Sequence, residues 1–100
     1  MARQVTVAAV QAALGPDMTA NIARVEALIR EAAAQGAEVV LPPELFQGIY
    51  FPTRQDPKWF ETAYAVNEHP CVRTFAALAN DLNVVIPISF FEKDGPHFYN

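Results

Sequence analysis

Cysteine is nearly absent from this 100-residue chain, which has Cys71 as its one example. A single Cys excludes an internal disulfide framework and suits a reducing compartment, so we expect a cytoplasmic protein. Positive charge is also scarce, because seven Lys and Arg residues stand against eleven Asp and Glu residues, for a formal net charge of −4. A chain without excess cations is poorly suited to a phosphate backbone or an anionic membrane. We therefore expect no nucleic-acid partner and no membrane partner.

Long apolar runs, clustered glycines and metal-ligand spacings are missing as well. None of the apolar stretches approaches the ~20 residues needed to cross a bilayer. The four glycines are scattered, which excludes a glycine-rich phosphate loop. His69 and His97 have no carboxylate or Cys at the spacing of metal ligands. We expect neither a metal nor an organic cofactor.

The chain has the composition of a globular protein, with 52% hydrophobic residues. Near its start, residues 5–14 form a mostly apolar run. The run could be the apolar part of a secretory signal, but Thr6 and Gln11 interrupt it and only one Arg precedes it. Its valines suit a pleated, largely buried strand. We therefore predict a strand here.

The next segment predicts a helix and a second strand. Apolar residues recur at helical spacing over residues 17–35, Asp17 or Thr19 can cap the start and Gly36 can end the helix. Residues 37–41 are a β-branched run with little alternation, which is typical of a strand covered on both faces. Strand, helix and strand make a βαβ unit, so the two strands should be parallel.

The rest of the chain predicts a loop, two helices and two strands. Residues 44–55 form a loop that is too apolar to be freely solvated, and Asp56-Pro57 begins a short helix. His69-Pro70 begins a second long helix that ends near Asn83. Residues 83–91 read as a third strand, although Pro87 places it at an edge or a bulge. After a turn over residues 93–96, Phe98-Tyr99 should return antiparallel to that strand.

Glu44 stands where α/β proteins gather catalytic groups, outside the carboxyl end of a strand. It follows the rigid pair Pro42-Pro43 and has aromatic neighbours in sequence. An apolar setting would make this carboxylate a useful general base. The alternative is a loop carboxylate that accepts backbone hydrogen bonds or faces water.

The motif around Glu44 resembles a known family. The segment LPPELF at residues 41–46 is similar to the first catalytic segment of the nitrilase superfamily of carbon–nitrogen hydrolases. Within it, GIYF at 48–51, VVIPISFFE at 84–92 and FYN at 98–100 look most like the N-carbamoylputrescine amidohydrolases. The resemblance implies an α/β fold, the N-terminal portion of a four-layer α-β-β-α sandwich. Residues 1–100 would then be the incomplete N-terminal part of a single domain.

The resemblance also implies a Glu, Lys and Cys triad, in which a Cys thiolate attacks the carbonyl carbon and a Lys holds the oxyanion. Glu44 would be the general base, and the family's Lys and Cys would lie beyond Asn100. The implied substrate is N-carbamoylputrescine, hydrolysed through a covalent thioester to putrescine, carbon dioxide and ammonia. Cys71 begins a helix rather than following a strand, so we reject it as the nucleophile. The segment alone should be inactive.

Tyr50 is the candidate substrate-binding residue, because the family uses this loop to wall its pocket. Packing beneath the loop with Phe46 and Phe51 is the commoner role for such a ring. Residues 52–54, Pro-Thr-Arg, depart from many relatives and leave open a sister amidase that acts on another N-carbamoyl amine or a β-ureido acid. A non-catalytic α/β binding module is a further alternative. The resemblance implies a homo-oligomer.

Overall fold

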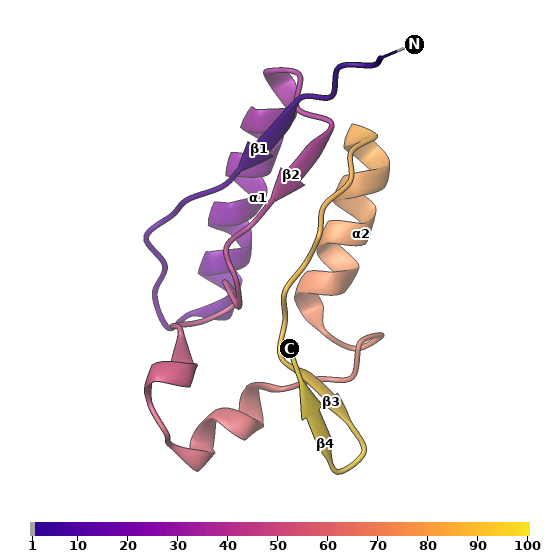
Figure 1. The fold of residues 1–100 in the computed structure, drawn as a ribbon. Coiled ribbons are helices and arrows are strands. Elements are labelled where there is room, and N and C mark those ends of the chain that lie inside the picture. The colour runs from indigo at the N-terminus through magenta and orange to yellow at the C-terminus, as the bar shows by residue number, and fades with distance from the viewer. Residues whose placement is uncertain (1) are drawn as a thin grey trace.

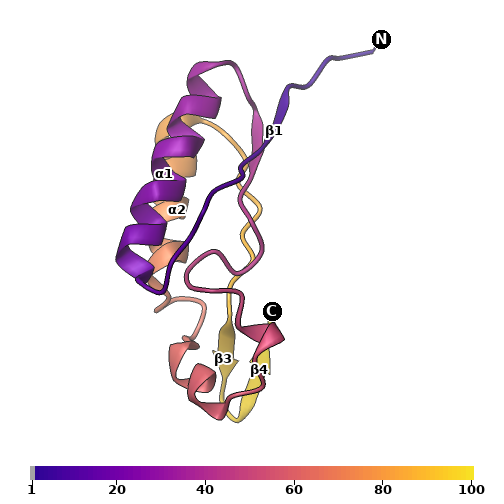
Figure 2. The ribbon, with the colours of Figure 1, turned by 90° about the vertical axis from the view of Figure 1, so that its left-hand side faces the viewer.

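The computed structural model describes residues 2–100 as a small parallel sheet with both long helices against one face (Figures 1 and 2). Strand β1 (Val7–Ala9) pairs in parallel with β2 (Val39–Leu41), with Val7 opposite Val39. Helix α1 (Met18–Ala34) connects them, so the predicted βαβ unit is confirmed. Helix α2 (Pro70–Leu82) packs beside α1.

Local chemistry fixes the ends of both helices. The Asp17 side chain accepts a hydrogen bond from the Ala20 N–H at 3.1 Å, and Gly36, with φ +98°, follows the last turn of α1. Before α2, the His69 Nδ1 atom accepts a hydrogen bond from the Cys71 N–H at 3.1 Å. Asn83 ends α2 in the left-handed conformation, with φ +53°. Both helices therefore begin and end as the sequence predicts.

The core lies between the helices and the sheet. Phe46, in the loop after β2, is fully buried and packs edge-to-face on Phe75 of α2, with ring centroids 5.3 Å apart. Its buried partners come from both helices, β2 and the connection between α1 and β2: Val25, Ile29, Ala37, Val40, Cys71 and Leu78. The loop that carries Glu44 is therefore attached directly to the core.

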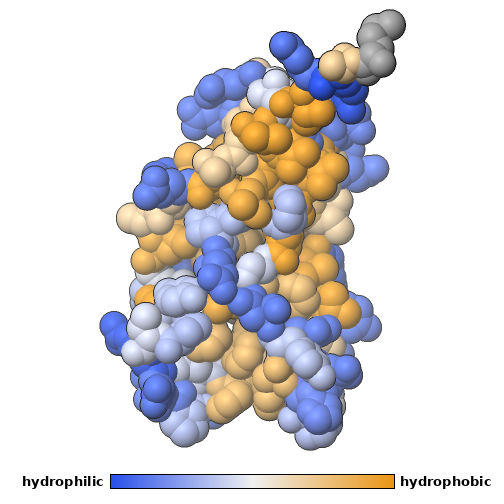
Figure 3. Space-filling model, viewed as in Figure 1, coloured by the Kyte–Doolittle hydropathy of each residue, from blue (hydrophilic) through white to orange (hydrophobic). Residues whose placement is uncertain are grey.

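The prediction that the strands are covered on both faces does not hold within residues 2–100, although Val40 of β2 is buried. Val7 in β1 is 68% exposed and Leu41 in β2 is 51% exposed, and apolar atoms gather over these strands in Figure 3. The physical reason is that α1 and α2 cover the same face of the sheet (Figure 2). The other face has no covering layer among residues 2–100.

The predicted third strand is reduced to one bridge. The Val40 N–H donates to the Val85 carbonyl and the Val85 N–H donates to the Glu38 carbonyl, both at 2.9 Å. Two residues later Pro87 has no N–H to donate, so the ladder does not continue. Residues 83–91 therefore extend the sheet without forming a regular strand.

The hairpin at the end of the chain is confirmed, with a different partner. β3 (Glu92–Asp94) pairs antiparallel with β4 (His97–Tyr99), so the returning strand pairs with residues after 91 rather than with 83–91. The turn contains Gly95, with φ +58°, and sets Asp94 opposite His97. This tight turn fixes the pairing of the two strands.

The aromatic loop packs as predicted, through short 3-10 helices rather than an α-helix. The first covers Phe51–Thr53 and the second Pro57–Thr62, where the Asp56 side chain accepts from the Lys58 N–H at 3.0 Å. So short a segment tightens readily into i to i+3 hydrogen bonds. Phe51 stacks on Trp59, and further tilted or edge-to-face contacts join the rings of this region to those near the hairpin: Phe51, Phe60, Phe91 and Phe98. Neither α-helix within residues 2–100 is long and apolar enough to span a membrane.

Candidate active site

Glu44 lies just beyond the carboxyl end of β2, as the sequence predicts. Pro42 and Pro43 separate it from the strand, and the Glu44 side chain is exposed while Leu45, Phe46 and Gln47 are buried. Leu45 has φ +51°, a left-handed conformation that a residue with a branched side chain rarely adopts. This turn of the backbone directs the carboxylate outward while the following side chains enter the core.

Two polar groups contact the Glu44 carboxylate. Asn100 Nδ2 donates to Oε1 at 2.7 Å, and the Tyr50 hydroxyl donates to Oε2 at a longer 3.4 Å. The expectation of an apolar setting is therefore wrong for residues 2–100. After the chain reverses at Leu45, Phe46 enters the core and Phe51 stacks on Trp59, so Tyr50 is the aromatic neighbour that contacts the carboxylate. The carboxylate has one oxygen held firmly and one held loosely.

Tyr50 is exposed beside Glu44. Its side chain is 48% exposed, so the alternative in which it packs beneath the loop is wrong. With Glu44 it borders a hollow of about 300 Å³ whose apolar wall includes Leu14, Pro43 and Ile49. A hollow of this size next to a carboxylate and a phenol has room for a small polar molecule.

Ser89 and Asn100 complete the site, and the sequence did not assign them a role. The Ser89 hydroxyl donates to Asn100 Oδ1 at 2.6 Å and accepts from the Leu45 N–H at 3.2 Å. Both residues fall in segments that support the family resemblance. The order of residues in a sequence does not indicate which distant positions are close in space. The contacts among residues 44, 89 and 100 are therefore visible only in the folded chain.

Cys71 is a core residue. It is fully buried at the start of α2, and burial raises the pKa of its thiol to about 12, although a hydrogen bond with the Gln47 side chain opposes this shift. A thiol with so high a pKa is a poor nucleophile. The structure therefore supports its rejection as the catalytic Cys.

None of the hydrogen bonds to the Glu44 carboxylate within residues 2–100 comes from Lys58, Lys93 or His69. Lys58 pairs with Asp56 at 3.7 Å and Lys93 is exposed in β3.

His69 is 1% exposed between the rings of Tyr64 and Phe90, and burial lowers its pKa. The sequence did not predict that the His69 side chain is buried and accepts the Cys71 N–H, because a His-Pro pair indicates only where a helix begins. No group of three metal-binding side chains occurs within residues 2–100.

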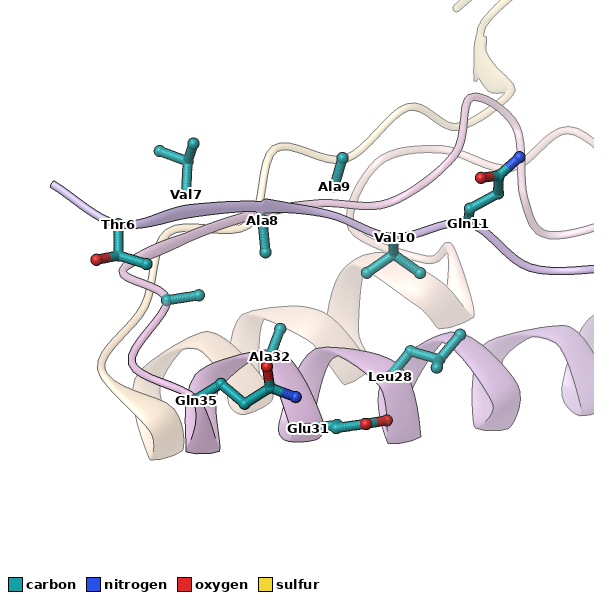
Figure 4. A pocket seen from close by; sticks show the side chains of 11 residues that line it. Thr6, Val7, Ala8, Ala9, Val10, Gln11, Leu28, Glu31, Ala32 and Gln35 are labelled. Carbon is teal, nitrogen blue, oxygen red and sulfur yellow. The ribbon is translucent and has the colours of Figure 1, made fainter.

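A larger groove of about 460 Å³ lies between β1 and α1 (Figure 4). Thr6, Val10 and Gln11 line it from the strand side, and Leu28 and Glu31 from the helix. It exists because β1 pairs only with β2 among the described strands, which leaves one of its edges open above α1. Glu44 and Tyr50 are not part of its wall, so this groove is separate from the candidate site.

A parallel βαβ unit with a tethered carboxylate beyond its second strand defines an α/β protein with an enzyme-like site at the carboxyl edge of the sheet. Residues 6–100 match the carbon–nitrogen hydrolase family, and the chain belongs to that family. Relatives of this chain are named amidase, citrullinase and nitrilase.

Curated relatives and a solved structure agree with this assignment. N-carbamoylputrescine amidase from Arabidopsis thaliana is 42% identical over 98 residues, which are 98% of this chain and 33% of the relative. Citrullinase from Francisella tularensis is 40% identical over 96% of this chain and 34% of the relative. A carbon–nitrogen hydrolase from Helicobacter pylori superposes with a TM-score of 0.82 at 24% identity, over 96% of this chain and 33% of its own, and shows the same fold. The chain spans about a third of the length of these relatives.

Proposed function

We propose that residues 1–100 are the N-terminal part of a single carbon–nitrogen hydrolase domain, and that the whole protein hydrolyses N-carbamoylputrescine to putrescine, carbon dioxide and ammonia. Relatives named for this activity, from Arabidopsis thaliana and Solanum lycopersicum, match 98% of the chain at 42% and 43% identity. The observation that carries the proposal is the exposed Glu44 carboxylate, held by Asn100 on one oxygen and bordering a small hollow.

In the proposed mechanism Glu44 moves protons through the oxygen that is not held by Asn100. It takes the proton of a Cys thiol supplied by the rest of the domain, and the thiolate attacks the carbonyl carbon of the substrate. A Lys, also outside these residues, stabilises the oxyanion as the tetrahedral intermediate forms. The proton held by Glu44 passes to the putrescine nitrogen as its bond to the carbonyl carbon breaks, which releases putrescine and leaves a carbamoyl thioester. Glu44 then activates the water that hydrolyses this thioester to the free thiol and carbamate, and the carbamate breaks down to carbon dioxide and ammonia.

Tyr50 is the proposed substrate contact. Its exposed ring and hydroxyl stand on the same side of the hollow as the Glu44 carboxylate, and the 3.4 Å bond between them is long enough to be exchanged for a bond to substrate. We place no metal or organic cofactor in this reaction. A homo-oligomeric state, a cytoplasmic location and the absence of nucleic-acid and membrane partners stay predictions from the sequence.

The first test is Glu44→Gln in the full-length protein, because Gln keeps the shape but cannot take a proton. Turnover of N-carbamoylputrescine should fall by at least about 10²-fold, the usual contribution of a general base. Glu61→Gln is the matched control, since Glu61 is exposed in the second 3-10 helix. Turnover of Glu44→Gln within a few-fold of the parent would show that Glu44 is a structural acceptor, as in a binding module. The isolated segment, without Lys and Cys partners, should show no amidase activity.

A sister amidase is the second candidate, because the relative named citrullinase is 40% identical over nearly the whole chain. The far end of each substrate distinguishes the two readings. An N-carbamoyl amine presents an ammonium, whereas a β-ureido acid presents a carboxylate, and each needs the opposite charge in the pocket. Comparing kcat/KM for N-carbamoylputrescine, citrulline and a β-ureido acid decides between them.

A further inference from the structure

The hydrogen bonds around Glu44 form a closed loop with one direction. The Leu45 N–H donates to the Ser89 hydroxyl at 3.2 Å, that hydroxyl donates to Asn100 Oδ1 at 2.6 Å, and Asn100 Nδ2 donates to Glu44 Oε1 at 2.7 Å. The loop starts at the backbone of the residue after Glu44 and ends on the Glu44 side chain. Every member donates toward the carboxylate.

This direction follows from the chemistry of each group. The Leu45 N–H can only donate, so it occupies a lone pair of the Ser89 oxygen and leaves the single hydroxyl proton for Asn100. The Asn100 amide must then present its oxygen to Ser89 and its NH2 group to Glu44. An ionised carboxylate accepts only, which matches the end of the chain. Bonds that point the same way strengthen one another.

Ser89 is itself fixed to the loop that carries Glu44. Besides the bond from Leu45, the buried Gln47 side chain donates through Nε2 to the Ser89 carbonyl at 2.8 Å. These bonds fix the position of Ser89 relative to the loop that carries Glu44, whereas Asn100 reaches the site from the end of the β3–β4 hairpin. The orientation of the Asn100 amide depends on Ser89.

We propose that Ser89 and Asn100 are positioning residues that hold Glu44 by Oε1 and so aim Oε2 at the reacting atoms. The inference rests on the proposed function, because it assigns a purpose to the proton-accepting oxygen of Glu44. Ser89 acts through Asn100, and Asn100 acts through Glu44. Loss of either residue frees the carboxylate to rotate, and small misplacements of a catalytic group are costly in rate.

The test compares variants of the full-length enzyme by their kcat and KM for N-carbamoylputrescine. Asn100→Ala should lower kcat about ten- to a hundredfold with little change in KM, because it removes a hydrogen bond to a charged group. Asn100→Asp keeps the shape but places an oxygen beside Glu44 Oε1, and it should lower kcat at least as much. Ser89→Ala should lower kcat about three- to tenfold, and Ser89→Thr, which keeps the hydroxyl, should restore most of it. Asn80→Ala, an exposed substitution on α2, is the matched control.

A double substitution separates positioning from independent effects. Ser89→Ala should lower kcat much less in the Asn100→Ala background than in the parent, because its effect on the carboxylate passes through that amide, while loss of the bond from the Leu45 N–H is common to both backgrounds. Additive losses would overturn this order of action, and a raised KM with kcat preserved would make Asn100 a substrate contact instead. If Glu44→Gln is inactive while both single variants keep the parent kcat, the positioning proposal fails and the proposed function stands. If Glu44→Gln is active, the proposed function fails first.

Discussion

Phe46 connects the loop that carries Glu44 to the core, and replacing it tests that connection. The ring is fully buried, so its removal gives up about 1.5–3 kcal/mol of apolar transfer free energy. The edge-to-face pair with Phe75 contributes a further ~0.5–1.5 kcal/mol. The unfilled cavity adds the remainder, and the free energy of unfolding should fall by about 3–5 kcal/mol in Phe46→Ala. That is a large share of the ~5–15 kcal/mol of a typical protein.

Urea unfolding of the full-length protein measures this loss directly. Tyr99→Ala is the control, because Tyr99 is 51% exposed and its removal should cost about 1 kcal/mol or less. A cost below about 1.5 kcal/mol for Phe46→Ala would mean that the ring is not buried as described and that the loop has another anchor. The same result would weaken the case that Glu44 is held in place by the core.

Three further predictions concern caps, pH and the site. Asp17→Ala should lower the free energy of unfolding by ~1 kcal/mol, measured by urea unfolding, because the Ala20 N–H loses its partner. Burial lowers the pKa of His69, so its contribution to stability should be complete above pH 6.5, its ordinary value, and decline as the pH falls from there toward the lowered folded-state pKa. His69→Asn should flatten this decline in urea midpoints between about pH 7.5 and 5, and an unchanged slope would contradict it. Tyr50→Phe should lower kcat/KM for N-carbamoylputrescine about two- to tenfold if its hydroxyl contacts substrate; an unchanged value would exclude that contact.

Helices and caps were predictable from the sequence because their determinants are local. Asp17 and Gly36 act within one turn of the residues they terminate. The exposed faces of β1 and β2 were not predictable, because an apolar run does not report how many of its faces are covered within these residues. The single bridge at Val85 shows the same limit for strand length.

The position of Glu44 was predictable and its surroundings were not. A carboxylate that follows a parallel strand and two prolines must lie beyond the carboxyl end of that strand, and this position can be predicted from the sequence. The aromatic neighbours suggested an apolar setting, but neighbours in sequence need not be neighbours in space after a reversal at Leu45. The Leu45–Ser89 and Glu44–Asn100 hydrogen bonds span 44 and 56 positions and depend on the finished fold.

Leu45 makes opposing demands on any substitution. Its backbone, with φ +51°, favours Gly or Asn, while its side chain is 4% exposed and favours a large apolar group. Gly would relieve strain of about 1–3 kcal/mol but lose about 2–5 kcal/mol of buried contact, and Asn would bury an amide. Directed evolution for thermostability should therefore find little to improve at this position.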